Sequence, residues 1–376
     1  MRVALDATSL LGPRTGVGTF TAELLAALAA RHDEPPLELT AFGLTWRGRE
    51  DLRPLVPAGI DVVRRPMAAR PLRELWQRID LPPVEWWTGP VDVVHGPNFV
   101  VPPARRAAEV VTVHDLTCVR FPEMCTRDVL AYPGLLRRAM ARGAWIHTVS
   151  TSVADEVAAT FAIDPARVRT VPNGAPAPLD PDRLGPMAAR GRHLAGSTDY
   201  VVALGTLEPR KDLPTLVRAF DVVAAEQPDI GLVIAGPDGW GADAVATAIA
   251  AARHRNRIRR LGWVTDADRD ALLAGARVFA YPSLYEGFGL PPLEALAHRT
   301  PVLATRAGAL PEVLVDAAEW AQPGDPDDLA AGLFRLLDDD DRCRALVHAG
   351  LARLDAFSWE RTADGLVTLY RDAWHG

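Results

Sequence analysis

Short apolar runs alternate with helix-like segments along most of the chain. Seven runs predict strands in the first half: Val3–Leu5, Leu37–Phe42, Val62–Val63, Val91–Val94, Val110–Val113, Trp145–Val149 and Val168–Val171. Five more follow in the second half: Tyr200–Leu204, Gly231–Ala235, Ile258–Leu261, Val278–Tyr281 and Val302–Ala304. Such continuous runs are typical of strands covered on both faces. The alternation therefore predicts an α/β fold with doubly wound parallel sheets.

The pattern is interrupted between residues 173 and 198. This segment is rich in Pro, Gly and Ala, has no sustained apolar period, and indicates a linker or excursion between two domains. We expect one Rossmann-like domain over 1–172 and a second over 199–356. Ligands of open α/β sheets bind beyond the carboxyl ends of the strands, so two such domains facing each other predict a ligand in the cleft between them.

Composition and charge exclude several classes of protein. Hydrophobic residues make up 48% and charged residues 24% of the 376 positions, which excludes a disordered, collagen-like or coiled-coil chain. The net charge of −7 argues against a nucleic-acid partner. Residues 1–172 hold 20 Arg and 19 acidic residues, whereas the remainder has a net charge of −8. The first domain is thus better suited to anionic material.

Localisation is predicted from what the sequence lacks. The three cysteines, Cys118, Cys125 and Cys343, are too few and too irregular for a disulfide framework or a zinc site, and we expect them to be reduced. No secretory signal is readable, and no run of about 18 apolar residues indicates a membrane span. We expect a soluble cytoplasmic protein.

The first candidate site is the glycine segment Gly12-Pro-Arg-Thr-Gly16-Val-Gly18, which follows the first strand and opens a helix. Backbone N–H groups at such a turn suit a phosphate. Thr21 stands where the dinucleotide fingerprint needs a third glycine, so a Rossmann dehydrogenase is disfavoured. A plain tight turn remains the alternative.

The second candidate is Gly205-Thr-Leu-Glu-Pro-Arg210-Lys211-Asp212, between the strand at 200–204 and a helix that Asp212 is expected to cap. Two cations at a helix N-terminus form a diphosphate site, and a solvated basic pair is the alternative. Lys211 is the single lysine among 41 basic residues. This favours a functional role, because elsewhere arginine supplies every positive charge and this position keeps a compact ammonium.

The third and most specific candidate is Glu286-Gly-Phe-Gly-Leu-Pro-Pro-Leu-Glu294, after the strand at 278–281. Glycines let a backbone approach a ligand closely, and two carboxylates can accept hydrogen bonds from sugar or ribose hydroxyls. We expect Glu286 in the loop and Glu294 in the first turn of a helix. First turns favour acidic residues in any case, which would account for Glu294 but not for Glu286.

The fourth candidate is His114-Asp115 at the end of the strand at 110–113. Such a histidine can donate a hydrogen bond to a substrate hydroxyl or to the main chain, and a structural role is the alternative. Metal binding is not expected there, and the acidic run 338–341 indicates a solvated loop or helix end rather than a metal site. The sequence contains no nucleophile elbow and no Walker loop.

These pieces, in this order, resemble the family-4 retaining glycosyltransferases of the GT-B fold. The resemblance covers nearly the whole chain through the following segments: the loop near Gly16, His114-Asp115, Val171–Gly174, Glu208–Lys211, Glu286–Glu294, Gly308–Glu312 and Phe357–Trp359. It implies that a final helix over 357–376 crosses back onto the N-terminal domain. Many relatives carry Arg where this chain has Thr206. The resemblance therefore implies that binding of the donor diphosphate depends more strongly on Arg210 and Lys211.

The resemblance also implies roles for individual residues. Arg210 and Lys211 hold the donor diphosphate, with the backbone at Gly16, Gly205 and Thr206. Glu294 binds the ribose, and the main chain around Gly262 and Val264 flanks the base. The transferred sugar is held by Glu286 and the backbone of Gly287, Phe288, Gly289 and Leu290, with His114 near the anomeric carbon.

The function that the resemblance implies is retaining transfer of a hexose, with mannose from GDP-mannose as the best candidate, to a glycan, lipid-linked or small-molecule acceptor. No cofactor or metal is expected. A nucleotide-sugar epimerase of the same fold and a non-catalytic partner subunit that binds a sugar nucleotide are the alternatives.

A peripheral contact with the inner face of a membrane is one interpretation of a set of basic and aromatic residues in the first domain: Arg70, Arg73, Trp76, Arg78, Trp86 and Trp87. Packing of the tryptophans with solvated arginines is the interpretation we favour.

Overall fold

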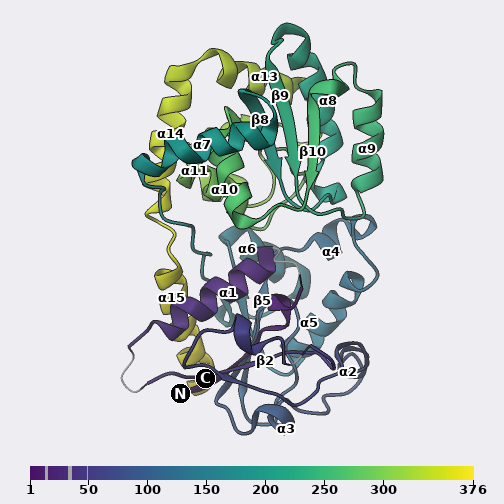
Figure 1. Ribbon diagram of the computed structural model, residues 1–376. Helices are drawn as coiled ribbons and strands as arrows, with labels where there is room; N and C mark the ends of the chain where they lie inside the picture. The colour runs from purple at the N-terminus through teal and green to yellow at the C-terminus, as the bar shows by residue number, and fades with distance from the viewer. Residues whose placement is uncertain (13–15, 33–35, 49) are drawn as a thin grey trace. The chain divides into compact units, whose positions relative to one another are not determined.

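A computed structural model describes residues 1–12, 16–32, 36–48 and 50–376 (Figure 1). The chain divides into two compact units. Unit 1 contains Met1–Gly174 and Trp359–Gly376, and unit 2 contains Ala175–Ser358. The expectation that two domains face each other across a cleft stays a prediction.

Unit 1 is built on a seven-stranded parallel sheet with the order β3-β2-β1-β4-β5-β6-β7. Its strands are β1 Arg2–Asp6, β2 Glu38–Phe42, β3 Asp61–Val62, β4 Val93–Gly96, β5 Ala108–Val113, β6 Trp145–Thr148 and β7 Val168–Thr170. Each of the seven strands predicted for the first half is present. The central strands are almost wholly buried, as expected for strands covered on both faces.

Helices cover both faces of this sheet. The α-helices are α1 Gly16–Ala29, α2 Ala69–Trp76, α3 Glu85–Thr88, α4 Thr117–Arg120, α5 Tyr132–Ala141, α6 Thr151–Phe161 and α15 Trp359–His375. Short 3-10 turns are η1 Thr8–Leu10, η2 Arg53–Leu55, η3 Pro122–Met124, η4 Val129–Ala131 and η5 Pro165–Arg167. In the glycine segment of the first candidate site, residues 13–15 lie outside the described residues, and Gly16 opens α1.

Unit 2 is built on a six-stranded parallel sheet with the order β10-β9-β8-β11-β12-β13. The strands are β8 Asp199–Leu204, β9 Ile230–Ala235, β10 Ile258–Gly262, β11 Val278–Tyr281, β12 Val302–Thr305 and β13 Glu319–Ala321. The five strands predicted for this half are present, and β13 at the sheet edge was not predicted. The two Rossmann-like sheets confirm the predicted fold class.

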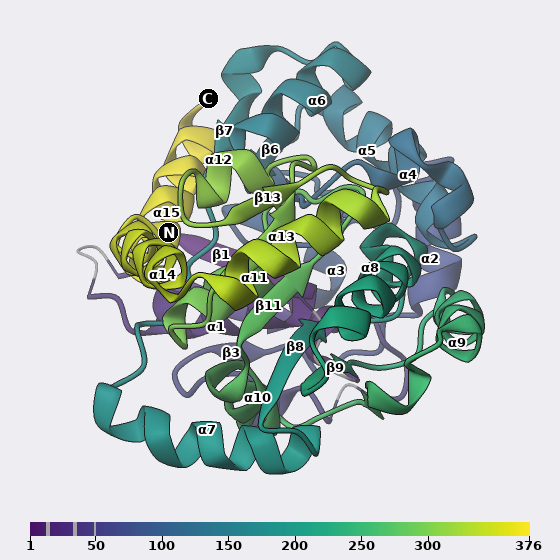
Figure 2. The ribbon, with the colours of Figure 1, turned by 90° about the horizontal axis from the view of Figure 1, so that it is seen from above.

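The helices of unit 2 are α7 Pro181–Ala195, α8 Leu213–Glu226, α9 Ala242–Ala251, α10 Asp266–Gly275, α11 Leu290–Ala297, α12 Leu310–Leu314, α13 Pro326–Asp338 and α14 Asp340–Leu354, with 3-10 turns η6 Pro209–Lys211 and η7 Arg255–Arg257. Figure 2 shows α13 crossing the strands, and its Leu329 and Leu333 share a core cluster with Val201 of β8. The acidic run 338–341 forms the junction of α13 and α14, where Asp339 caps α14.

The segment predicted as a linker is mostly helical. Helix α7 packs against α10 through glycines that leave no room for a side chain. A Cβ at Gly191 would lie 2.0 Å from the carbonyl oxygen of Ala271, and one at Gly275 would lie 2.8 Å from that of Ala188. Of the two predicted alternatives, a plain linker does not apply to 181–195, which is helical, and an excursion stays a prediction. The helix was not foreseen because an interface made of Gly and Ala produces no apolar period in the sequence.

The last helix, α15, belongs to unit 1, which confirms that the chain returns to the N-terminal domain. Its buried residues Leu366 and Tyr370 share a core cluster with Val3, Leu5 and Phe20. The helix begins at Trp359 rather than at Phe357.

A buried chain of hydrogen bonds ties α15 to the sheet. His147 Nε2 lies 2.9 Å from the carbonyl oxygen of Val171, which can only accept, so this nitrogen donates. The other ring nitrogen of His147 then accepts from the hydroxyl of Thr112 at 2.9 Å, and that hydroxyl accepts from His95 Nε2 at 2.7 Å. His95 Nδ1 in turn accepts from the hydroxyl of Tyr370 at 2.7 Å. Burial lowers the pKa of both histidines, so both rings are neutral, and the Thr112 hydroxyl joins them by donating to one ring and accepting from the other.

This chain predicts that acid destabilises unit 1. Burial lowers the pKa of His147 from 6.5 to about 4. The unfolded chain therefore binds more protons below pH 6.5, so stability is full above that pH and is lost as the pH falls toward 4. For His147 alone we expect a loss of about 2 kcal/mol between about pH 7 and pH 5. Urea denaturation followed by circular dichroism at both pH values measures it.

The variant His147→Gln retains an N–H donor toward Val171 but does not titrate. It should show a flatter dependence of the free energy of unfolding on pH than the unaltered chain. An equal slope for both proteins would contradict the assignment of the neutral form.

Candidate active site

Polar residues of unit 2 gather where two neighbouring strands end. Strands β8 and β11 pair in parallel, so the loops that follow them emerge at the same edge of the sheet. Gly205 follows β8 with a φ of 139°, a conformation that favours glycine. The turn η6 then carries Arg210 and Lys211 directly before α8, as predicted for the second candidate site.

The carboxylate of Glu286 joins the second and third candidate sites. Its Oε2 lies 2.6 Å from a terminal guanidinium nitrogen of Arg210, and its Oε1 lies 2.7 Å from Nζ of Lys211. The hydroxyl of Ser283 donates to the same Oε1 at 2.7 Å. Glu286 is only 6% exposed. The structure thus brings three of the predicted site residues into one buried cluster.

The charge states of this cluster follow from its contacts. Burial alone would raise the pKa of Glu286, but the charges of Arg210 and Lys211 and the hydrogen bonds from Lys211 and Ser283 lower it to about 2. Burial lowers the pKa of Lys211, and the carboxylate of Glu286 opposes that effect. Glu286 therefore remains a carboxylate at neutral pH and cannot serve as a proton donor.

A compact ammonium fits this place for a geometric reason. Nζ of Lys211 donates to the hydroxyl of Tyr281 at 2.5 Å and lies 4.5 Å from the centre of that ring, while it also contacts Glu286. The ammonium can turn its three N–H groups toward partners on different sides, which a planar guanidinium cannot do. Arg210 instead lies along the loop, where it donates to the carbonyl oxygen of Tyr285 at 2.8 Å.

Backbone contacts hold the loop that carries Glu286. The N–H of Leu284 donates to the carbonyl oxygen of Arg210 at 2.8 Å, and that of Ala309 donates to the carbonyl oxygen of Glu286 at 2.8 Å. Gly308 has a φ of 55°, and a Cβ there would lie 2.1 Å from the carbonyl oxygen of Glu286. A larger residue at 308 would therefore displace Glu286.

The glycine loop leads into α11, which Pro291 and Pro292 open as predicted. Gly289 adopts a φ of 118° immediately before the helix, and Leu290 is its first residue. Phe288 is 6% exposed and packs edge-on against Phe357, so Gly287 and Gly289 flank a side chain that points away from solvent.

Glu294 is the fifth residue of α11, so the prediction that it lies in the first turn was wrong. The preference of first turns for acidic residues therefore does not account for it. Its Oε2 lies 3.8 Å from Nε of Arg269, and burial raises the pKa of Glu294 while the charge of Arg269 lowers it.

The loops after β8, β9 and β10 contact one another. A Cβ at Gly236 would lie 1.9 Å from the carbonyl oxygen of Gly205, and the N–H of Gly236 donates to the carbonyl oxygen of Gly262 at 2.7 Å. Thr206 lies in the first of these loops, and a Cβ at Gly239 would lie 2.9 Å from its methyl group. In the third loop, Val264 is half-buried and Trp263 is 60% exposed.

His114 lies in unit 1 at the end of β5, apart in the chain from the cluster of unit 2. Its Nε2 is 2.7 Å from the carbonyl oxygen of Pro97 and so donates to main chain, one of the two partners foreseen for it. Burial lowers its pKa, which leaves a neutral ring between Phe20 and Phe99 whose Nδ1 can accept a hydrogen bond. Gly16 also belongs to unit 1.

Several residues of the site were not predicted. Tyr281 and Ser283 were missed, although each is polar and lies at or just beyond the carboxyl end of β11. Arg269 and Gly308 were given no role. The polar residues that follow a buried strand are the signal that could have identified the first two.

Comparisons with known proteins show the family of the chain. Residues 14–177 match the family described as Glycosyltransferase Family 4, and residues 190–353 match the family described as Glycosyl transferases group 1. The O-antigen chain mannosyltransferase B of Escherichia coli is 29% identical, over 99% of this chain and 100% of its own length. An MMP α-(1→4)-mannosyltransferase of Mycolicibacterium hassiacum is 34% identical, but the match covers 60% of this chain and 53% of that relative.

Solved structures share the fold. HepE from Anabaena, crystallised with UDP and glucose, superposes with a TM-score of 0.72 at 17% identity over 98% of both chains. The sucrose-phosphate synthase of Thermosynechococcus elongatus gives a TM-score of 0.75 at 19% identity, over 99% of this chain and 98% of its own. These likenesses confirm the GT-B fold.

The matches to two glycosyltransferase families, together with the GT-B fold, identify the chain as a glycosyltransferase. With its two domains matching glycosyltransferase families over most of its length, the chain belongs to family 4 of these enzymes. Among the described helices, none is long and apolar enough to cross a membrane. In the same part of the chain, no group of three His, Cys, Asp or Glu side chains could hold a metal ion, and the three cysteines are free.

Proposed function

We propose that this glycosyltransferase transfers a hexose with retention of anomeric configuration, without a metal ion, from a nucleotide diphosphate sugar to a glycan, lipid-linked or small-molecule acceptor. One observation carries the proposal. Arg210 and Lys211 lie beside a buried carboxylate, Glu286, at the carboxyl ends of neighbouring strands. Cations beside a sugar-binding carboxylate are what a substrate with a diphosphate and a hexose requires.

In the proposal each residue of the site has a role that its contacts support. Two of the three N–H groups of Lys211 donate to Tyr281 and Glu286, so the third can donate to a phosphate oxygen. Arg210 supplies a second cation to the diphosphate, with the backbone at Gly205 and Thr206. Glu294 and the loop at 262–264 would hold the ribose and the base.

In the proposed reaction the bond between the anomeric carbon and the phosphate oxygen breaks through an oxocarbenium-like transition state. The fixed charges of Arg210 and Lys211 stabilise the departing diphosphate. Glu286 stays ionised and faces the positive charge that develops on the sugar. The acceptor hydroxyl attacks from the face that the leaving group vacates, and its proton passes to the leaving phosphate.

The donor is proposed from the relatives. The two relatives named above are called mannosyltransferases, and the first of them acts on the O-antigen chain. Mannose from GDP-mannose is therefore the proposed donor, and a polysaccharide under assembly is the proposed class of acceptor. HepE was crystallised with UDP, so a uridine donor is the alternative that the experiment has to separate.

The test is thermal unfolding with GDP, UDP, ADP, dTDP and their sugars. A ligand at about 100 times its dissociation constant should add about 2.7 kcal/mol of stability. We expect the largest shift with GDP-mannose, unchanged by EDTA, and a smaller shift for Lys211→Ala. The variant Arg344→Ala, at an exposed ion pair on α14, is the control and should respond as the unaltered protein does.

Radiolabelled donor with and without an acceptor glycan then tests transfer. Product that forms only with acceptor, in the α-configuration of the donor, supports the proposal. An equal shift of thermal stability with every nucleotide would overturn the assignment of the donor. A product with inverted anomeric configuration would overturn the retaining mechanism.

A further inference from the structure

A bulky residue between β4 and β5 of unit 1 adopts a strained backbone. Phe99 has a φ of 59°, a conformation that residues with large side chains rarely adopt. The N–H of Val100 donates to the carbonyl oxygen of Asn98 at 2.7 Å, so Phe99 lies at the centre of a three-residue turn. With a positive φ this is the rare and strained form of the γ-turn.

No helix end accounts for this conformation. Among the described residues other than glycine, four more have a positive φ, and each adjoins the end of a helix: Ala162, Asp212, Arg299 and Val315. Phe99 instead lies between two strands. Strained residues of this kind persist only where the surrounding structure enforces them, and they are concentrated at functional sites.

Contacts on several sides hold the turn in place. The N–H of Phe99 donates to the carbonyl oxygen of Thr112 in β5 at 2.9 Å. Phe99 is 7% exposed, and its ring stacks on that of Tyr132 with 5.0 Å between centres and 12° between planes. At the end of β4, a Cβ at Gly96 would lie 1.9 Å from the carbonyl oxygen of Val100, so glycine leaves the space that the returning chain occupies. Packing and hydrogen bonds therefore offset the strain.

The chain that leads into the turn contacts His114. The carbonyl oxygen of Pro97 lies 2.7 Å from Nε2 of His114, and because a carbonyl can only accept, this nitrogen carries the proton. The ring of His114 lies 5.1 Å from that of Phe20 at an angle of 81°, and 6.2 Å from that of Phe99 at 64°. Two aromatic rings thus confine the imidazole, and the Pro97 carbonyl fixes its proton.

We propose that Asn98, Phe99 and Val100, called the Phe99 turn, form a positioning element for His114. The turn holds the Pro97 carbonyl where it keeps the proton of His114 on Nε2, so that Nδ1 presents a lone pair to a hydroxyl of the transferred sugar. The consequence for turnover rests on the proposed function, in which His114 contacts that sugar. The state of the ring in the free protein does not depend on any substrate.

The first measurement is NMR of the full chain with ¹⁵N-labelled histidines, without substrate, and the variant His114→Gln identifies the signal. The ring proton of His114 should be found on Nε2 and should exchange slowly with water, because it is buried and hydrogen-bonded. A proton on Nδ1, or exchange as fast as in a free histidine, would overturn the proposal. This measurement on the unaltered chain decides the matter even where a variant of Phe99 does not fold.

Two variants separate the backbone of the turn from the ring of Phe99. Phe99→Gly and Phe99→Val both remove the ring, but glycine accepts a positive φ and a β-branched valine does not. If Phe99 acted only by packing, glycine would be the more damaging change, since it leaves the larger cavity. The proposal predicts the opposite order. Phe99→Gly should keep the slowly exchanging proton, whereas Phe99→Val should lose it and turn over at least about tenfold more slowly than Phe99→Gly.

Ala162→Val is the matched control. It places the same kind of strain at an exposed residue of unit 1, after α6, where φ is 49°. This variant should leave both the His114 signal and the turnover unchanged. Thermal unfolding establishes which variants are folded at the assay temperature. Equal effects of Phe99→Gly and Phe99→Val, or a larger loss with glycine, would overturn the proposal. If the unaltered chain transfers no sugar but the NMR signals follow the expected order, the proposed function fails and the positioning of the ring stands.

Discussion

Replacing Lys211 by alanine should lower the turnover of sugar transfer by about 100- to 1000-fold, the usual effect of removing one group that stabilises developing charge. The ammonium is held between Tyr281 and Glu286, so its position is fixed before the substrate arrives. Initial rates with saturating donor and acceptor measure the effect. Arg190→Ala, which removes an exposed ion pair of unit 2, is the matched control and should leave the rate unchanged.

Lys211→Arg tests the geometry rather than the charge. A guanidinium keeps the positive charge but cannot direct donors to Tyr281, Glu286 and a phosphate at once. We therefore expect a loss of turnover close to that of the alanine variant. Full activity of the arginine variant would show that only the charge matters, and unchanged kinetics of Lys211→Ala would exclude the residue from the reaction.

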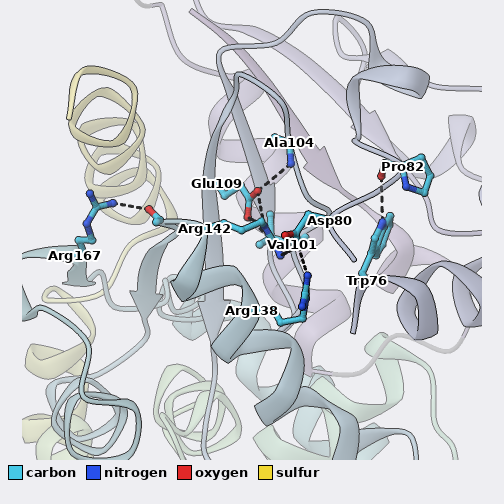
Figure 3. A network of polar contacts seen from close by, with 10 residues as sticks. Trp76, Asp80, Pro82, Val101, Ala104, Glu109, Arg138, Arg142 and Arg167 are labelled. Atoms are coloured by element: carbon cyan, nitrogen blue, oxygen red, sulfur yellow. Dashed lines mark hydrogen bonds and ion pairs between the residues drawn. The ribbon is translucent and has the colours of Figure 1, made fainter. Parts of the chain in front are cut away.

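Replacing Arg142 by methionine should lower the free energy of unfolding by about 3–5 kcal/mol, because it leaves a buried carboxylate without its partner. Figure 3 shows Arg142, the residue directly after α5, extended toward Glu109 of β5. Its guanidinium contacts both carboxylate oxygens at 2.7 to 3.0 Å. Glu109 is 8% exposed and also accepts the N–H of Ala104 at 2.9 Å. Urea denaturation gives the free energy directly.

Arg138→Met is the matched control for that measurement. Arg138 contacts Asp80, a carboxylate that is 46% exposed, so its removal should cost less than about 1 kcal/mol. The double variant Arg142→Met/Glu109→Gln should recover much of the loss, since no buried charge remains. Equal effects of the two single variants would contradict the argument.

The strands could be predicted from the sequence because a strand buried on both faces consists of a continuous run of apolar residues. Strand β13 was not predicted because it has only three residues and begins with a charged residue, Glu319. Glu319 forms ion pairs with Arg335 and Arg342. Helix α7 was not predicted because it contacts α10 through glycine rather than through large apolar residues.

The candidate site was predictable in its parts but not in its contacts. Arg210, Lys211 and Glu286 follow buried strands, which is a local property of the sequence. That Glu286 contacts both cations depends on β8 and β11 being neighbours, although β9 and β10 lie between them in the chain. Sheet order is a non-local property, and so the contact of Tyr281 with Lys211 could not be assigned in advance. The contact of Ser283 with Glu286 is local, since three positions separate the two residues.

The return of α15 to unit 1 makes unit 2 a nested domain, inserted between Gly174 and Trp359 of a discontinuous one. These two residues touch, since a Cβ at Gly174 would lie 2.5 Å from the indole of Trp359. During synthesis the insert is complete before the helix that fills the core of its host emerges from the ribosome. Because domains fold as units, we expect unit 2 to reach its native state first. Unit 1 can complete its core only after its last eighteen residues, Trp359–Gly376, have been synthesised.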